Sequence, residues 1–260
     1  MHMSEISTAL RIFKRLSIVF KRDEIVETLV GYENPILVDQ IVYKTLIRSQ
    51  QIKNGDPLEI SELRIFLGML CSHPQSQVVV DFGGGAGTHF DALSSAFPEI
   101  DFSYYVIETP EMSRKASDFR STDKKLHFLT LDEIDQLPKS IDLLVANSSL
   151  QYTDSPIQTL TVLGKLKPRK LWITRFPLNE SDGFFSIRQI SKLDDNGPGH
   201  LSALSNQLVE YVANVVSLRS FEEELTRNFD VTMKVIEERN PYGGEYKTIN
   251  SYGYLAKLKI

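Results

Sequence analysis

Apolar residues follow a helical spacing up to about residue 75 of this 260-residue chain. They recur there at every third or fourth position, as they do on the buried face of a helix. Three segments carry the pattern: 10–20, 36–47 and 60–70. This predicts a helical N-terminal extension over residues 1–75, serving as a lid or as a dimer contact.

From residue 78 the apolar residues instead form short continuous runs that are rich in β-branched side chains. Such runs are typical of strands buried on both faces of a parallel sheet. Segments with helical spacing separate most of the runs, which predicts βαβ units. The predicted strands are 78–82, 102–107, 126–129, 141–146 and 170–176, and the predicted helices between them are 89–97, 111–119 and 157–166.

The C-terminal third is less regular. Residues 178–220 show no clear period and are predicted to form a substrate-side insertion, in which Phe184, Phe185 and Ile187 could wall a pocket. A predicted helix (221–228) and two predicted strands (230–237 and 251–260) follow. The loop between these strands favours an antiparallel pair. Residues 76–260 are therefore predicted to form one α/β domain, Rossmann-like, with a mostly parallel sheet and an antiparallel last strand.

Charge and cysteine content narrow the class of protein. The formal net charge of −5 disfavours nucleic acid as the main partner, although residues 1–22 alone carry +4. The single cysteine, Cys71, excludes an intramolecular disulfide framework and fits a reducing compartment. No apolar run approaches the roughly 18 residues of a transmembrane segment, and no secretory signal is visible. We therefore expect a cytoplasmic protein.

A glycine-rich loop, Asp81-Phe82-Gly83-Gly84-Gly85-Ala86-Gly87, lies between the first predicted strand and a helix. Glycines let a ligand approach the backbone closely, and the helix N-terminus behind them offers free N–H groups. A dinucleotide G-x-G-x-x-G motif would need a third glycine at position 88 or 90, where Thr88 and Phe90 stand. A P-loop is excluded because no Gly-Lys-Ser/Thr follows. The pattern that fits is acid-x-G-x-G-x-G.

This pattern resembles motif I of the class I S-adenosylmethionine-dependent methyltransferases. Glu108 ends the next predicted strand, 21 positions after Gly87, where that family has an acid that binds both ribose hydroxyls. A carboxylate suits a vicinal diol because it offers two acceptor oxygens. Segments 79–90, 106–110, 147–156 and 172–178 are similar to a little-characterised bacterial methyltransferase family, whose members often accompany surface-polysaccharide or secondary-metabolite genes.

The resemblance implies S-adenosylmethionine as cofactor, S-adenosylhomocysteine as product, and no metal. It also implies a set of cofactor-binding residues: Asp81, Gly83, Gly84, Gly85, Gly87, Glu108, Thr130, Leu131, Asn147 and Ser148. None of the five histidines is paired at i, i+4, so the sequence contains no metal-ligand signature.

Methyl transfer from a sulfonium is an in-line displacement, so holding the two reactants in line can supply much of the catalysis. A general base is needed only where the acceptor starts protonated. The candidate catalytic residues are His200, in the insertion, and Gln151 and Tyr152, after the fourth predicted strand. Arg175 could bind an anionic substrate group or pair with an acid, and the sequence leaves both open.

The acceptor is predicted to be a small molecule, through O- or N-methylation of a sugar or secondary metabolite. Methyltransferases that act on base amino groups carry Asp/Asn-Pro-Pro-aromatic where this chain has Asn147-Ser148-Ser149-Leu150. Two alternatives remain: a non-catalytic cofactor- or partner-binding module of the same fold, and, disfavoured by the glycine spacing, a nicotinamide oxidoreductase. A homodimer through the N-terminal helices is also open.

Overall fold

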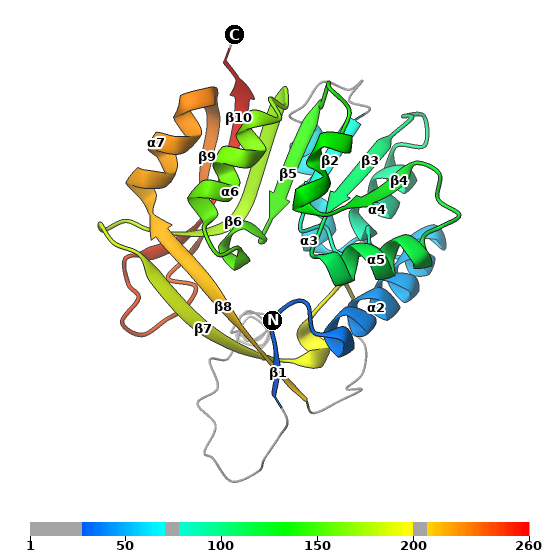
Figure 1. The fold of residues 1–260 in the computed structure, drawn as a ribbon, viewed down its shortest axis with the longest axis horizontal. Helices are drawn as coiled ribbons and strands as arrows, with labels where there is room; N and C mark the ends of the chain where they lie inside the picture. Colours follow the sequence, from blue (N-terminus) through cyan, green and yellow to red (C-terminus); the bar gives the residue numbers. More distant parts are fainter. Residues whose placement is uncertain (1–27, 71–77, 200–206, 260) are drawn as a thin grey trace, which may run out of the picture.

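The computed structural model describes residues 28–70, 78–199 and 207–259 (Figure 1). Its helices are α2 (Pro35–Lys53), α3 (Ile60–Leu70), α4 (Thr88–Ala96), α5 (Pro110–Phe119), α6 (Pro156–Lys165) and α7 (Leu218–Asn228), with short 3₁₀ turns η1 (Leu131–Gln136), η2 (Leu150–Tyr152) and η3 (Leu193–Asp195). Its strands are β1 (Thr28–Val30), β2 (Val78–Phe82), β3 (Ser103–Ile107), β4 (Leu126–Leu129), β5 (Leu143–Asn147), β6 (Lys170–Asn179), β7 (Phe185–Lys192), β8 (Leu208–Ser217), β9 (Phe229–Arg239) and β10 (Ile249–Leu258).

The main sheet has the order β4-β3-β2-β5-β6-β10-β9. The first five strands are parallel, whereas β10 runs antiparallel to both β6 and β9. The prediction of an α/β fold with a mostly parallel sheet and an antiparallel last strand is confirmed. Strands β2 and β5 are central and buried on both faces, which explains their continuous apolar runs.

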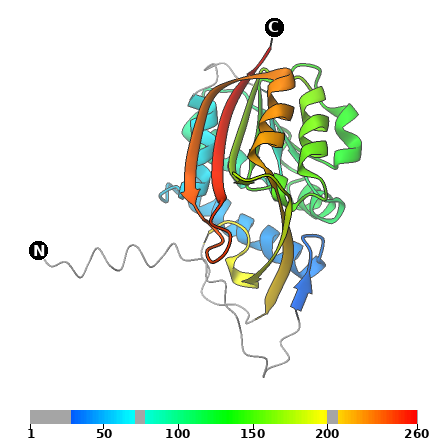
Figure 2. The ribbon, with the colours of Figure 1, turned by 90° about the vertical axis from the view of Figure 1, so that its left-hand side faces the viewer.

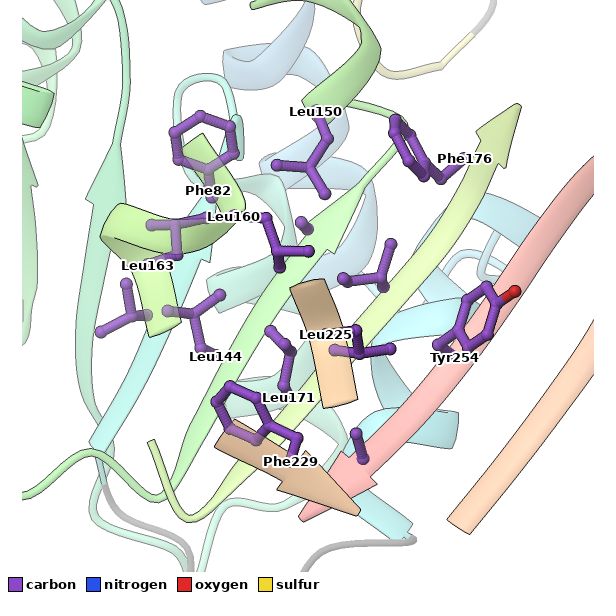
Figure 3. Close-up of a cluster of buried hydrophobic side chains, with 14 of the residues drawn as sticks. Phe82, Leu144, Leu150, Leu160, Leu163, Leu171, Phe176, Leu225, Phe229 and Tyr254 are labelled. Carbon is purple, nitrogen blue, oxygen red and sulfur yellow. The ribbon is translucent and has the colours of Figure 1, made fainter. Parts of the chain in front are cut away.

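Helices cover both faces of this sheet. On one face, α6 and α7 pack Leu160, Leu163 and Leu225 against the strands in the largest apolar core (Figure 3). On the other face, α3 and α4 bury a second core around Trp172. The indole Nε1 of Trp172 donates to the backbone oxygen of Arg64 at 3.0 Å, which ties α3 to β6.

Helix α2 lies at the carboxyl edge of the sheet, beside α4 and α5. Asn34 caps it, because the Asn34 side chain accepts a hydrogen bond from the amide of Ile36 at 3.0 Å. A third apolar core joins α2 to α5 and β8 and includes Ala86 of the glycine loop. The second and third predicted helices are confirmed as α2 and α3, while the apolar stripe at residues 10–20 lies outside the described residues.

The front segment is not helical throughout, because Thr28–Val30 forms β1, which pairs parallel with β8. The 178–220 segment is also more regular than predicted. It contains β7 and β8, an antiparallel pair that projects from the main sheet together with β1 (Figure 2). Strand β8 rejoins the main sheet through a short parallel contact with the end of β6. Strands β1, β7 and β8 with α2 and η3 form what we call the cap.

None of the helices within the described residues has both the length and the apolar content that crossing a membrane requires.

Candidate functional site

The glycine loop turns sharply between β2 and α4. Gly83, Gly85 and Gly87 all adopt left-handed backbone angles, with φ of 77°, 61° and 87°. Glycine adopts this region without the steric cost that other residues meet. A Cβ at Gly83 would overlap the side chain of Ser149, so the backbones of this loop and of the β5 end lie very close together. Gly87 precedes α4 and offers no side chain to cap it, which leaves the first-turn amides available to a ligand.

Glu108 lies at the end of β3 and faces this loop. Its Oε1 accepts a hydrogen bond from the amide of Gly85 at 2.8 Å, and its Oε2 accepts one from the amide of Thr109 at 3.0 Å. Burial raises the pKa of Glu108 above its ordinary value, and the two backbone hydrogen bonds oppose that shift. The carboxylate predicted to bind a ribose is therefore held directly against the glycine loop.

Asp81 is completely buried at the end of β2. Its Oδ2 accepts hydrogen bonds from Tyr104 Oη of β3 and from His89 Nδ1 of α4, both at 2.8 Å. Burial acts to lower the pKa of His89, but the charge and hydrogen bond of Asp81 outweigh it, and the pKa is raised. Burial raises the pKa of Tyr104 well above its ordinary value, so this side chain stays neutral.

At the end of β5 the chain bends sharply through Ser148, whose φ of 55° is unusual for a residue other than glycine. The amide of Ser148 donates to the backbone oxygen of Thr174 at 2.9 Å, and Gln151 Nε2 donates to Ser148 Oγ at 3.0 Å. Gln151 is only 3% exposed. The bend therefore brings Asn147, Ser148 and Gln151 to the same edge as the glycine loop.

Four of the buried polar side-chain atoms that lack a hydrogen-bond partner lie at this edge, and others lie elsewhere in the described part of the chain. The four are Asp81 Oδ1, Thr109 Oγ1, Asn147 Oδ1 and Gln151 Oε1, which follow or end β2, β3 and β5. Buried polar groups are nearly always paired, so these four oxygens are available to accept hydrogen bonds from a ligand or from water. Our sequence analysis missed Thr109. The available signal was its position, since it directly follows Glu108 and begins a helix that its hydroxyl does not cap.

Tyr152 has a packing role in the structure. Its ring lies 4.9 Å from that of Tyr32 and 5.3 Å from that of Tyr211, measured between centroids. This tyrosine trio joins η2 to the cap. Of the other candidates, the amide and hydroxyl of Thr130 both donate to Glu133 and so cap η1, and Leu131 packs against the largest core. His200 lies outside the described residues.

Of the predicted pocket walls of the insertion, Ile187 is buried in a small core with Val215 and Ile249. Phe184 and Phe185 are exposed, and the Phe185 ring lies 6.1 Å from that of Tyr246, which packs against this core. The glycine loop faces α2 instead, since a Cβ at Gly85 would lie 3.8 Å from Ile41. Within the described ranges, no group of three or more His, Cys, Asp or Glu side chains could hold a metal ion.

Comparisons with known proteins identify the fold. No protein-family model and no curated protein sequence matches the chain. Among solved structures, the [4+2]-cyclase SpnF shares 11% identity over 90% of this chain and 98% of its own, with a TM-score of 0.52. The N-terminal domain of EvdMO1 with SAH bound shares 11% identity over 78% of this chain and 82% of its own, with a TM-score of 0.50. A second structure of that domain, in the presence of SAH and D-fucose, has the same TM-score and covers 85% of that chain.

The strand order of this chain supports the same fold as these solved structures. Parallel strands on either side of β2 and β5, followed by the antiparallel β10 and β9, place the glycine loop at the point where the strand order reverses. The chain thus has the fold of the class I S-adenosylmethionine-dependent methyltransferases.

Proposed function

We propose that this protein is an S-adenosylmethionine-dependent methyltransferase that acts on a small molecule. The observation that carries the proposal is the set of unpartnered buried oxygens beside Glu108 and the glycine loop. The cofactor has the matching donors, namely an ammonium group, two ribose hydroxyls and an adenine amino group. The loop glycines carry no side chain, so a ligand could approach their backbone closely.

Different residues would bind different parts of the cofactor. Glu108 would hold the ribose diol, and the loop amides with the N-terminus of α4 would hold the carboxylate of the amino-acid end. Asn147 and Ser148 would lie toward the methyl end. When bound, the cofactor supplies an activated methyl group on a sulfonium.

On the acceptor side, Gln151 would orient the substrate through its unpartnered Oε1. Helix α2 packs against Ala86 and lies beside Gly85, so it would shield this part of the loop from water. Tyr152 would support the acceptor region from the tyrosine trio. A role for His200 as general base, where the acceptor starts protonated, stays a prediction.

We infer that the acceptor is a sugar or secondary metabolite, methylated at oxygen or nitrogen. The acidic net charge and the Asn147-Ser148-Ser149-Leu150 sequence disfavour a nucleic-acid base. A domain of the same fold was crystallised in the presence of SAH and D-fucose, which makes sugars the first acceptors to test.

Calorimetry of the full chain tests the cofactor site. S-Adenosylhomocysteine should bind the wild type, and Glu108→Ala should weaken it by about ten- to a hundredfold, because two charge-assisted hydrogen bonds are lost. Glu238→Ala is the matched control, since Glu238 is exposed on β9. Absence of binding of both S-adenosylmethionine and S-adenosylhomocysteine at high micromolar concentration would overturn the proposal.

A second candidate follows from one comparison. SpnF has this fold and is named a [4+2]-cyclase, so the fold by itself does not establish methyl transfer. Incubation with methyl-labelled cofactor and a panel of sugars and small metabolites separates the two. Labelled product supports a methyltransferase, whereas cofactor binding with no transfer across the panel favours a cofactor-binding module or another reaction.

A further inference from the structure

The ionisable side chains behind the glycine loop interact through the buried carboxylate of Asp81. Asp81 is held by two donors on the same oxygen, His89 Nδ1 and Tyr104 Oη, each at 2.8 Å. The His89 side chain is 14% exposed and that of Asp81 is 1% exposed, so solvent screens this pair weakly. The pair lies directly behind the loop, because a Cβ at Gly84 would come within 2.6 Å of Asp81 Cγ.

His89 faces ionisable groups from several elements, and most of them are already paired. Glu62 of α3 acts on His89 but is buried in a bidentate ion pair with Arg48 of α2. Asp91, on the same helix as His89, is paired with Arg120. Tyr104 shares Asp81 Oδ2 with His89 and stays neutral, and Asp81 is the carboxylate bonded to His89. Among the charged groups that act on His89, Asp81 therefore has the strongest effect, and its charge and hydrogen bond together outweigh the opposing effect of burial.

The net charge of the site depends on that proton. Asp81 and Glu108 are close enough for the charge of Asp81 to contribute to the raised pKa of Glu108. With His89 protonated, the formal charges of these three side chains sum to −1, and with His89 neutral they sum to −2. Because Asp81 raises the pKa of His89, this change occurs at a pH above the ordinary histidine midpoint.

Resting on the proposed function, we propose that His89 controls how strongly this site distinguishes the sulfonium cofactor from its thioether product. S-Adenosylmethionine carries one more positive charge than S-adenosylhomocysteine, because methyl transfer converts the sulfonium to a neutral thioether. A more negative site favours the more positive ligand. The preference for S-adenosylmethionine over S-adenosylhomocysteine should therefore increase as His89 loses its proton.

The expected size follows from Coulomb's law. One unit of charge, acting over about 10 Å in the intermediate dielectric of a partly enclosed site, changes the affinity ratio by about three- to tenfold. The linkage is reciprocal, so the sulfonium ligand should also displace the proton from His89 more effectively than the thioether does.

Calorimetry at several pH values between about 6 and about 9 tests this inference. The affinities of S-adenosylmethionine and S-adenosylhomocysteine are measured for the wild type, for His89→Gln and for His127→Gln. Across this pH range, the ratio of S-adenosylmethionine affinity to S-adenosylhomocysteine affinity should change about three- to tenfold more in the wild type than in His89→Gln. The ligands' own amino groups titrate identically in both proteins, so the difference isolates His89. His127→Gln is the matched control and should behave like the wild type, because His127 is exposed on β4 and stacks on Tyr105.

The outcomes separate the two proposals. If neither ligand binds the wild type, the proposed function fails. If both bind and His89→Gln has the same pH profile as the wild type, the role of His89 alone is overturned. A merely structural role would weaken both ligands equally at every pH, which also contradicts the inference.

A measurement on the wild type covers the case in which His89→Gln does not fold. With isotope-labelled histidine, NMR follows the titration of His89 in the presence of each ligand. The midpoint should lie at lower pH with S-adenosylmethionine than with S-adenosylhomocysteine. Equal midpoints would overturn the inference.

Discussion

Replacing Gly84 with alanine tests whether the Asp81 network supports the glycine loop. The backbone of Gly84 lies outside the left-handed region, so alanine adds no backbone strain there. Its Cβ would instead come within 2.6 Å of Asp81 Cγ. The carboxylate is fully buried and held by Tyr104 and His89, so moving away from the new Cβ would strain or break one of these hydrogen bonds.

The magnitude follows from those contacts. Overpacking a tightly packed site costs about 1–3 kcal/mol. If the carboxylate shifts, one of its buried donors loses its partner at a further cost of about 1–3 kcal/mol. We expect Gly84→Ala to lower the free energy of unfolding by about 3 kcal/mol and to weaken S-adenosylhomocysteine binding.

Two other glycines separate steric overlap from backbone strain. Gly85 and Gly244 both have positive φ, at 61° and 57°, but a Cβ at Gly85 meets only Ile41 at 3.8 Å, and one at Gly244 meets nothing within 4 Å. Each alanine there should cost about 1 kcal/mol from strain alone. Gly244→Ala, in the connection between β9 and β10 and with nothing within 4 Å of its Cβ, should leave ligand affinity unchanged.

Urea unfolding with linear extrapolation measures the stabilities, and calorimetry measures the affinity. The reasoning is refuted if Gly84→Ala destabilises the protein no more than Gly244→Ala and binds S-adenosylhomocysteine as the wild type does.

Three further predictions follow from individual side chains. Lys44 Nζ donates to the backbone oxygens of Asp194 and Asn196, both at 2.7 Å, so Lys44→Met should lower the free energy of urea unfolding by about 2 kcal/mol; a loss no larger than that of the exposed Lys53→Met would contradict this. Gln151→Met should change stability by no more than about 1 kcal/mol, because loss of the hydrogen bond to Ser148 is offset by removal of the unpartnered buried Oε1, and it should reduce turnover of an acceptor more than it weakens cofactor binding. Unchanged turnover would exclude an orienting role for Gln151. Because the pKa of His89 is raised in the folded protein, protonated His89 stabilises the fold. This contribution to the free energy of unfolding is complete below the ordinary histidine pKa and is lost as pH rises through the folded-state pKa. The free energy of unfolding, measured at about pH 6 and at about pH 8.5, should show this loss in the wild type and not in His89→Gln. An equal loss in both proteins would rule the effect out.

The sequence predicted the parts of the fold that depend on neighbouring residues. Strands β2 and β5 were visible because their positions are buried on both faces, which requires a continuous apolar run. The glycine loop and Glu108 were visible because the backbone turn and the strand end need particular residues at fixed spacing.

Strands β7 and β8 were missed because they pack on one face only. In β8 the buried positions alternate along Val209, Tyr211, Ala213 and Val215, a period of two that the search for continuous runs overlooked. Strand β1 is only three residues long, and its partner in β8 lies about 180 residues away along the chain. No local pattern identifies a pairing of that kind.

The sequence by itself therefore determined the order of strands and helices from β2 to β6 and from α7 to β10, the glycine loop and the strand-end acid, since each arises from the preferences of adjacent residues. Only the tertiary structure decided which polar groups meet. His89 could be placed at the start of a helix from the sequence, but its bond to Asp81 and the sharing of that carboxylate with Tyr104 require β2, β3 and α4 to pack together. Burial then removes the solvent that would screen these charges, and for that reason the ionisation of this site is a property of the folded protein.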